Sequence, residues 1–332
     1  ISPCNVSLFF VSLSIKRPKI KIRFRYILLL LLLIPSVAGA MKPRLVVNIV
    51  VSQMRYDYLT RFERNFTQDG FRRFMEQGLV FTDARYDFMQ TTTPAALATI
   101  TTGANPSMHG VVSERWIDYT NNNVVTLIGC SEARGLECDH GIGMYSPRNL
   151  TAPTLGDRLR QEDPESKVVT IAADPVSAVV MGGMDSRVFW MDDTRGTWIS
   201  STAYMRMIPR WVEQYNALRI AQQYLDYNWT PSRQKHLYVN KENSIFGNGS
   251  DRAARAAMFD FLRREGIDRD YPKLLRTPVG NTLVAEFARQ AIANEALGED
   301  DHTDLLNICF DPPRHGSEMF GSESMETEDM IY

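Results

Sequence analysis

"RLVVNIVVSQMRYDYL" (residues 44–59) has the pattern of a buried strand that ends in a polar turn. Residues 45–51 are apolar except for Asn48, as is typical of a strand that is buried on both faces of a parallel sheet. The apolar run stops at Ser52. Because open parallel sheets bind ligands beyond the carboxyl ends of their strands, the position of Ser52 indicates a functional site. A serine there is unexpected, since its hydroxyl is a poor metal ligand and needs a base to act as a nucleophile.

The rest of the chain alternates strand-like and helix-like segments. Further strands are predicted at residues 79–86, 167–173, 188–193 and 303–310. Helices are predicted near residues 69–78, 93–103, 154–164, 203–227 and 281–297. This rhythm predicts an α/β fold with a mostly parallel sheet that is covered by helices on both faces. Residues 228–275 are polar and rich in turn formers, which indicates a cap-like insertion or a long loop within a domain that spans residues 41–332.

The composition is that of an ordinary globular protein. Of the 332 residues, 44% are hydrophobic and 23% are charged, and the formal net charge is −2. The chain has no excess of basic residues, so its composition does not suggest a nucleic-acid partner. The five histidines are scattered along the chain, so no His-rich metal cluster is visible.

Residues 1–40 differ from the rest of the chain. A basic block at residues 16–25 precedes the apolar segment "YILLLLLLIPSVAGA" (residues 26–40). Its apolar core of about ten residues is too short to span a bilayer comfortably, and Ala38 and Ala40 match a signal-peptidase site. We therefore predict a cleaved signal peptide and a periplasmic or otherwise exported protein, in preference to a membrane anchor. Residues 1 to about 15 are consistent with sequence that lies upstream of the true start of the protein. If the true start is Met41, there is no signal peptide and the protein stays in the cytoplasm.

Two cysteines, Cys130 and Cys138, bracket a polar loop. After export they could close a short disulfide, and the alternative is a pair of free thiols. Their spacing does not match a zinc site.

Six segments together resemble a known family. They are "RLVVNIVVSQMRYDYL", "TTTPAALATITTGANPSMHGVV", "MYSPRNLTAPTLGDRL", "SSTAYMRMIPRWVEQYN", "LLRTPVGNTLVAEFA" and "FGSESMETEDMIY". In this order they resemble the alkaline phosphatase superfamily in its type I phosphodiesterase/nucleotide pyrophosphatase branch, and especially its exported bacterial alkaline phosphatases with a threonine nucleophile. The resemblance implies two zinc ions, held by Asp and His residues at strand ends, that act on phosphoester substrates.

At the positions of the metal ligands, this sequence departs from the family pattern. Ser52 stands where the resemblance implies the first Asp ligand. In "FDPPRHGSEMFG" (residues 310–321), an ungapped alignment places Arg314 and Glu318 at the next Asp and His ligands. An alternative alignment, three residues earlier, retains Asp311 and His315 as the pair. We favour the ungapped alignment because the length of the segment is unchanged.

The positions that bind the phosphoryl group also differ. Thr93 occupies the position of the family's nucleophile, but the residues that follow it in the family are replaced here. The simpler interpretation of this threonine-rich segment is the N-terminus of a helix. Glu114 replaces an Asn that holds phosphoryl oxygens. Asp174 and Val176 replace a Lys-x-Arg pair, so that a cationic clamp is lost and one charge is reversed. Carboxylates at these positions would repel a phosphate dianion.

Taken together, the sequence predicts a catalytically impaired or inactive member of the family that binds no metal. It would act by binding, for example as an envelope component with a protein partner. The alternative is an active zinc-dependent phosphomonoester or phosphodiester hydrolase that uses Thr93 with Asp311 and His315. The resemblance also implies further strands carrying metal ligands, so we expect the C-terminal part of the fold to be missing and a sheet edge to be left unpaired.

Overall fold

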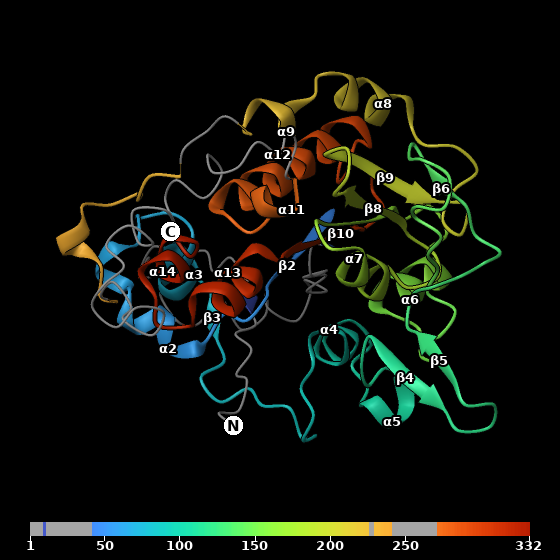
Figure 1. Ribbon diagram of the computed structural model, residues 1–332, viewed down its shortest axis with the longest axis horizontal. Helices are drawn as coiled ribbons and strands as arrows, with labels where there is room; N and C mark the ends of the chain where they lie inside the picture. The colour runs from blue at the N-terminus through green and yellow to red at the C-terminus, as the bar shows by residue number, and fades with distance from the viewer. Residues whose placement is uncertain (1–8, 11–41, 226–228, 241–270) are drawn as a thin grey trace, which may run out of the picture.

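The molecule is built around a central six-stranded sheet (Figure 1). The structure is a computed structural model, and it describes residues 9–10, 42–225, 229–240 and 271–332. The strand order is β2-β10-β7-β8-β9-β6. The first four of these strands run parallel, and β9 and β6 run antiparallel to their neighbours. The bounds are β2 (Leu45–Val51), β6 (Gly135–Leu136), β7 (Val168–Ala172), β8 (Arg187–Asp192), β9 (Thr197–Ser201) and β10 (Asp304–Phe310).

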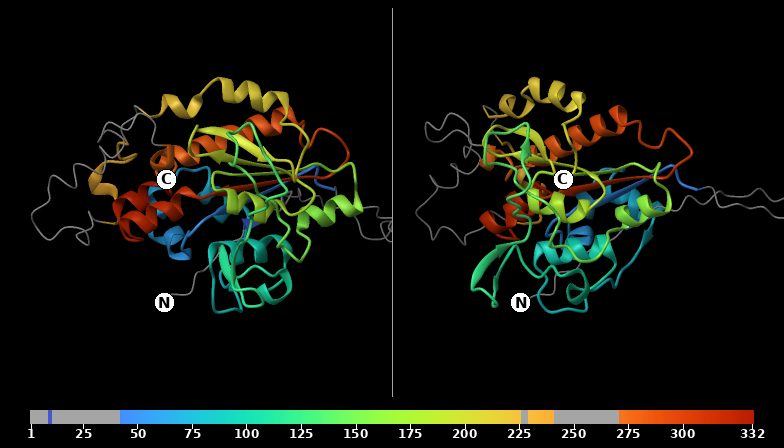
Figure 2. Two further views of the ribbon diagram at one scale, coloured as in Figure 1. Left: turned by 45° about the vertical axis from the view of Figure 1, so that its right-hand side comes forward. Right: turned by 90° about the vertical axis from the view of Figure 1, so that its right-hand side faces the viewer.

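Helices cover both faces of this sheet (Figure 2). The face that carries Ile171 and Ile308 packs against α12 and α8, whereas the face that carries Ala172 and Cys309 packs against α7 and α4. The helices are α2 (Tyr56–Arg61), α3 (Phe71–Gln77), α4 (Thr93–Thr102), α5 (Pro106–His109), α6 (Leu155–Glu162), α7 (Pro175–Gly182), α8 (Arg210–Ala217), α9 (Ile220–Gln223), α11 (Tyr271–Leu274), α12 (Pro278–Asn294), α13 (Pro312–Phe320) and α14 (Met325–Asp329), with short 3₁₀ turns at Glu63–Asn65 and Lys235–Leu237.

A line of polar side chains crosses the parallel strands and fixes their register. Asn48 of β2 donates from Nδ2 to Oδ1 of Asn307 at 3.0 Å, and Asn307 donates from Nδ2 to Oγ1 of Thr170 in β7 at 3.1 Å. These three residues are also direct neighbours in the strand register. Because a buried amide without a partner is costly, a shift of either neighbouring strand by one residue would break this line.

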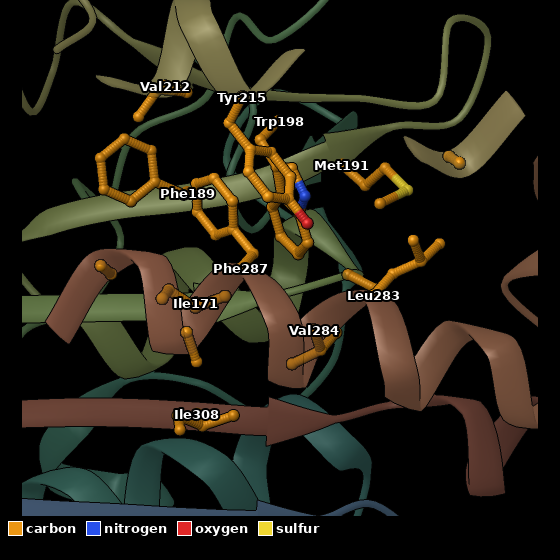
Figure 3. Close-up of a cluster of buried hydrophobic side chains, with 14 of the residues drawn as sticks. Ile171, Phe189, Met191, Trp198, Val212, Tyr215, Leu283, Val284, Phe287 and Ile308 are labelled. Atoms are coloured by element: carbon orange, nitrogen blue, oxygen red, sulfur yellow. The ribbon is translucent and has the colours of Figure 1, made fainter. Parts of the chain in front are cut away.

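The larger core lies between the sheet and α12 and is centred on Phe287 (Figure 3). The Phe287 ring stacks on Trp198 with a centroid distance of 4.1 Å and an interplanar angle of 10°. Phe189 and Tyr215 meet the same ring edge-on at 5.5 and 5.3 Å. One fully buried side chain therefore joins α12, α8 and two strands of the sheet.

We expect Phe287→Ala to lower the free energy of unfolding by about 3–5 kcal/mol, because it removes a ring and leaves a cavity that four aromatic neighbours line. Leu218→Ala is the matched control, since Leu218 is 61% exposed and its truncation should cost under about 0.5 kcal/mol. Chemical denaturation of both variants measures the difference, and equal losses would contradict this account of the core.

Most of the elements predicted from the sequence are present. α4 begins at Thr93 with Pro94 in its first turn and ends before Gly103, whose φ of +67° is left-handed. One predicted strand is wrong: of residues 79–86, only Leu79–Val80 (β3) form a strand, which pairs with β1 (Phe9–Phe10). The hairpin of β4 (Arg115–Asp118) and β5 (Asn123–Thr126) was not predicted.

The burial predicted for β2 needs a correction. This strand lies at one edge of the sheet, and Val47 and Ile49 are 42% and 45% exposed. An apolar sequence alone does not distinguish an edge strand from a central one, since the side chains are the same and only their neighbours differ.

The predicted disulfide is not formed. Cys130 and Cys138 are both free in the structure. The thiol of Cys138 donates to the carbonyl of Ile142 at 3.3 Å, and the nearby hydroxyl of Ser146 lowers the pKa of the Cys130 thiol.

The predicted signal peptide lies outside the described residues, apart from residues 9–10, and so does the greater part of the predicted insertion at residues 228–275. In the described remainder of the chain, no helix has the length and the apolar character needed to cross a lipid bilayer. Residues 229–240 contact α14, where Asp329 accepts hydrogen bonds from Trp229, Ser232 and Tyr238.

Candidate functional site

The carboxyl ends of the parallel neighbours β2, β10 and β7 lie side by side at one end of the sheet. The residues that follow them are Ser52, Asp311 and Asp174. The backbone N–H of Ser52 donates to the carbonyl of Phe310 at 3.0 Å, so that the pairing of β2 and β10 continues to the first residue of the site. The next residue, Gln53, has a left-handed backbone with φ of +55°, which turns the chain away from the sheet at once.

The carboxylate of Asp311 joins these strand ends. It is fully buried and accepts hydrogen bonds at Oδ1 from the hydroxyls of Ser177, at 2.7 Å, and Ser52, at 3.2 Å. Its Oδ2 accepts from the backbone N–H of Asp174 at 3.2 Å. Burial, together with the nearby charge of Asp174, raises the pKa of Asp311 to about 6, against the lowering effect of Arg314.

A buried guanidinium lies beside this carboxylate. Arg314, in the first turn of α13, places Nη2 2.5 Å from Oδ2 of Asp174, and its side chain is 8% exposed. Its Nη1 lies 3.6 Å from Oε1 of Glu114, which precedes β4. The other oxygen of Asp174 caps α7 by accepting from the backbone N–H groups of Val176 and Ser177 at 2.7 and 3.3 Å. Asp174 therefore binds a helix terminus and a cation at once.

His315 and Glu318 lie on the outer side of Arg314. Nε2 of His315 is 3.4 Å from Nη2 of Arg314, and its Nδ1 is 3.8 Å from Oε2 of Glu318. Burial and the neighbouring charge of Arg314 lower the pKa of His315. The imidazole is therefore neutral at pH 7, and its ion pair with Glu318 has little strength.

Thr93 stands at the beginning of α4, as the helix-start interpretation predicts. Within the described residues, no side chain forms a hydrogen bond with its hydroxyl. The preceding Thr92 donates from Oγ1 to the carbonyl of Val112 at 2.9 Å, two residues before Glu114. This hydrogen bond connects the start of α4 to the segment before β4 that carries Glu114, but it provides Thr93 with no base.

Comparison with known proteins shows where this arrangement belongs. The family model for type I phosphodiesterase / nucleotide pyrophosphatase matches residues 46–331. The chain is a member of this phosphodiesterase family. The prediction of the family and of its α/β fold is confirmed, and the family consists of phosphoester hydrolases.

Among the relatives of this phosphodiesterase-family chain are bacterial alkaline phosphatases. It is 30% identical to alkaline phosphatase PhoV of Synechococcus elongatus over 293 residues, covering 87% of this chain and 53% of PhoV. It is 31% identical to alkaline phosphatase PafA of Elizabethkingia meningoseptica over 303 residues, covering 87% of this chain and 54% of PafA. The crystal structure of wild-type alkaline phosphatase PafA superimposes with a TM-score of 0.77 at 29% identity, covering 87% of this chain and 57% of that one. The chain spans about half the length of these relatives.

The residues of this site do not fit the zinc ions that the family implies. Ser52 offers a neutral hydroxyl that already donates to Asp311, and Arg314 places a fixed positive charge between Asp174 and Glu114. A second cation there would meet electrostatic repulsion rather than ligands. In residues 42–225, 229–240 and 271–332, no group of three or more His, Cys, Asp or Glu side chains could hold a metal ion.

The alternative metal pair also has other partners. Both oxygens of Asp311 accept hydrogen bonds from protein donors, and His315 faces Arg314 and Glu318. The structure thus brings five residues together in a network of hydrogen bonds and ion pairs: Ser52, Asp311, Asp174, Arg314 and Glu114. Their polar atoms contact one another and do not point to a common metal site.

The sequence did not reveal Ser177 as a site residue. Its hydroxyl makes the shortest hydrogen bond to Asp311. The pattern Asp174-Pro175-Val176-Ser177 is that of a capped helix start with proline at the first position, and it could have identified α7 and the direction of its first turn. The partner of Ser177 lies 134 residues away, and no local pattern encodes that contact.

We expect Arg314→Met to lower the free energy of unfolding by about 3–5 kcal/mol, because it leaves Asp174 as an uncompensated carboxylate in a largely buried place. Adding Asp174→Asn should restore at least half of the loss, since that charge is then removed as well. Arg85→Met is the control: its ion pair with Asp83 is solvent-exposed and should contribute under about 1 kcal/mol. Denaturant titration of the four proteins decides, and a double variant no more stable than Arg314→Met would contradict the pairing.

The raised pKa of Asp311 predicts a pH dependence of stability. The folded protein binds this proton more tightly than the unfolded chain, so Asp311 lowers the free energy of unfolding as the pH rises from its ordinary pKa of 3.8 to about 6. Asp311→Asn removes this effect. Its stability relative to the parent should therefore improve by roughly 1–3 kcal/mol between pH 4 and pH 7. Chemical denaturation at intervals of one pH unit measures it, and a constant difference between the two proteins would refute the assignment.

Proposed function

We propose that this chain is a member of the type I phosphodiesterase family that does not hydrolyse phosphoesters and acts by binding. Following the apolar segment at residues 26–40, we also propose that it is exported and binds a protein partner in the envelope. Cell fractionation with detection of the chain tests the location, and a purely cytoplasmic chain would favour Met41 as the start.

One observation carries this proposal: the guanidinium of Arg314 occupies the space between the strand ends and is held there by Asp174 and Glu114. In a two-metal phosphatase, metal ions supply the positive charge that activates the nucleophile and stabilises the leaving oxygen. The charge of the Arg314 guanidinium is already balanced by Asp174 and Glu114, and a guanidinium has no coordination position at which it could bind the nucleophile and lower its pKa.

The remaining charges also oppose a phosphoester. Glu114, Asp174 and Asp311 contribute three carboxyl groups around the single guanidinium of Arg314. A phosphate dianion approaching this edge would meet a net negative potential. Thr93, the candidate nucleophile, lacks a hydrogen-bonded base in the described structure and would remain a weakly nucleophilic alcohol.

The alternative, an active zinc-dependent hydrolase, rests on the alkaline phosphatases among the relatives. It would need Asp311 and His315 to leave their present partners and turn toward a common ion. Zinc analysis and activity of the purified protein distinguish the two functions.

We expect the purified chain, dialysed against zinc, to retain less than 0.1 mol of zinc per mol and to hydrolyse phosphomonoesters and phosphodiesters no faster than its Thr93→Ala variant. The alkaline phosphatase PafA of Elizabethkingia meningoseptica, assayed alongside, is the positive control. Stoichiometric zinc together with turnover that Thr93→Ala abolishes would establish the hydrolase instead.

In the same assay, Ser52→Asp should not create an active enzyme. The new carboxylate would lie against Asp311, whose Oδ1 is 3.2 Å from the present hydroxyl, and Arg314 would still exclude a metal. Ser52→Asn is the matched neutral control of similar size. Zinc-dependent hydrolysis by Ser52→Asp would show that the lost first ligand is the only obstacle.

A further inference from the structure

Cys130 begins a tight turn whose backbone is fixed on both sides. Its N–H donates to the carbonyl of Met144 at 2.9 Å, and its carbonyl accepts from the N–H of Ala133 at 3.3 Å. Directly before it, Gly129 and Tyr145 form an antiparallel bridge. Cys130 itself is 8% exposed. The groups around its sulfur are therefore held in defined positions by the fold.

These groups favour the negatively charged form of the side chain. The nearby hydroxyl of Ser146 has the largest effect and lowers the pKa of the Cys130 thiol. Backbone N–H groups at Glu132 and Ala133 and the charge of Arg148 act in the same direction, and burial opposes them. Hydrogen-bond donors and a positive charge both stabilise a thiolate. The thiolate is the nucleophilic form of cysteine, so this turn is a place where a cysteine can react.

Ser146 contributes a buried hydroxyl that lacks a hydrogen bond. The residue is 6% exposed, and within the described part of the chain its Oγ has no hydrogen-bond partner. The bond from its backbone N–H to the carbonyl of Ile128, at 2.8 Å, holds this residue beside the turn. A buried hydroxyl without a partner is costly. An oxygen atom bound to the sulfur of Cys130 would give this hydroxyl the acceptor that it lacks.

We propose that Cys130 is an oxidation site, at which a hydroperoxide converts the thiolate to a sulfenic acid whose oxygen accepts a hydrogen bond from Ser146. The sulfur attacks one peroxide oxygen, and the S–O bond forms as the O–O bond breaks. The sulfur loses two electrons and the peroxide gains them. With hydrogen peroxide, the departing hydroxide takes the proton of the transferred hydroxyl and leaves as water.

The other cysteines in the described part of the chain have different surroundings. Burial raises the pKa of Cys138, and its thiol donates to the carbonyl of Ile142 at 3.3 Å. Cys309 is fully buried, and burial raises its pKa well above the ordinary value. Cys138 is nevertheless more exposed than Cys130. Exposure alone would make Cys138 the more reactive of these two, whereas the groups around the sulfur favour Cys130.

Peptide mapping tests the proposal on the full, folded chain. Trypsin cleaves after Arg134 and so separates Cys130, in residues 116–134, from Cys138, in residues 135–148. We expect hydrogen peroxide with dimedone, which labels sulfenic acids, to modify residues 116–134 roughly 5-fold faster than residues 135–148. In denaturant the two peptides should react at equal rates, because the turn is then lost.

Two serine variants test the role of the hydroxyl. Ser146→Ala should slow the labelling of residues 116–134 by roughly 3- to 10-fold, since the thiolate and its product lose a hydrogen-bond donor. Ser166→Ala is the matched control and should leave the rate unchanged. Ser166 is also buried with an unpartnered Oγ within the described residues, but it lies between α6 and β7. Thermal unfolding confirms that both variants are folded.

The comparison of the two peptides in the parent chain does not depend on the folding of a variant. A parent chain that labels residues 135–148 as fast as residues 116–134, or that gains no label on residues 116–134, overturns the proposal. A disulfide between Cys130 and Cys138 in place of the label does so as well. So does a folded Ser146→Ala variant that is labelled at the parent rate.

Discussion

The buried carboxylate of Asp311 is the contact on which the strand-end region depends. It binds the hydroxyl of Ser52 after β2, the backbone of Asp174 after β7 and the hydroxyl of Ser177 in α7, while it directly follows β10. The carboxyl ends of three neighbouring strands and the first turn of α7 are thus held together by a single side chain. A buried carboxyl group is expensive unless its oxygens are satisfied, and here donors from the protein satisfy both. If the carboxylate bound a metal instead, these donors would lose their acceptor and would need other partners.

Arg314 completes this electrostatic arrangement from within the protein. Two carboxylates, those of Asp174 and Glu114, lie near the ends of the parallel strands and need a counter-charge. Here Asp174 and Glu114 find their counter-charge in a side chain of α13. The charges of Arg314, Asp174 and Glu114 therefore form a coupled set, because the guanidinium lies between the two carboxylates. A site of this kind is stable as it stands, and reversing one residue disturbs its neighbours.

The sequence predicted the fold and the position of the site, but not the partners within it. Alternating apolar strands and helices determine a parallel sheet, and its topology places Ser52, Asp174 and Asp311 at one edge whatever their chemistry. The ion pair of Asp174 with Arg314 spans 140 residues, and only the packed structure selects it. The strand expected at residues 79–86 shows the same limit, because a β-prone sequence forms a strand where a neighbour is available to pair with it. Likewise, the apolar pattern of β2 could not indicate that, among the described strands, it pairs with β10 alone.

The central place of β10 in the sheet has a consequence for the order in which the chain can fold. β10 lies between β2 and β7, and Asn48 and Asn307, which align β2 with β10, are 259 residues apart in the sequence. Until the ribosome has made residues 304–310, β2 has no neighbour in this sheet and β7 lacks one of its two. Contacts of such long range carry a large loop-closure cost and form slowly. The nascent chain must therefore carry β2 without its partner β10 while the residues between them are made, and these strands pair only after β10 is complete.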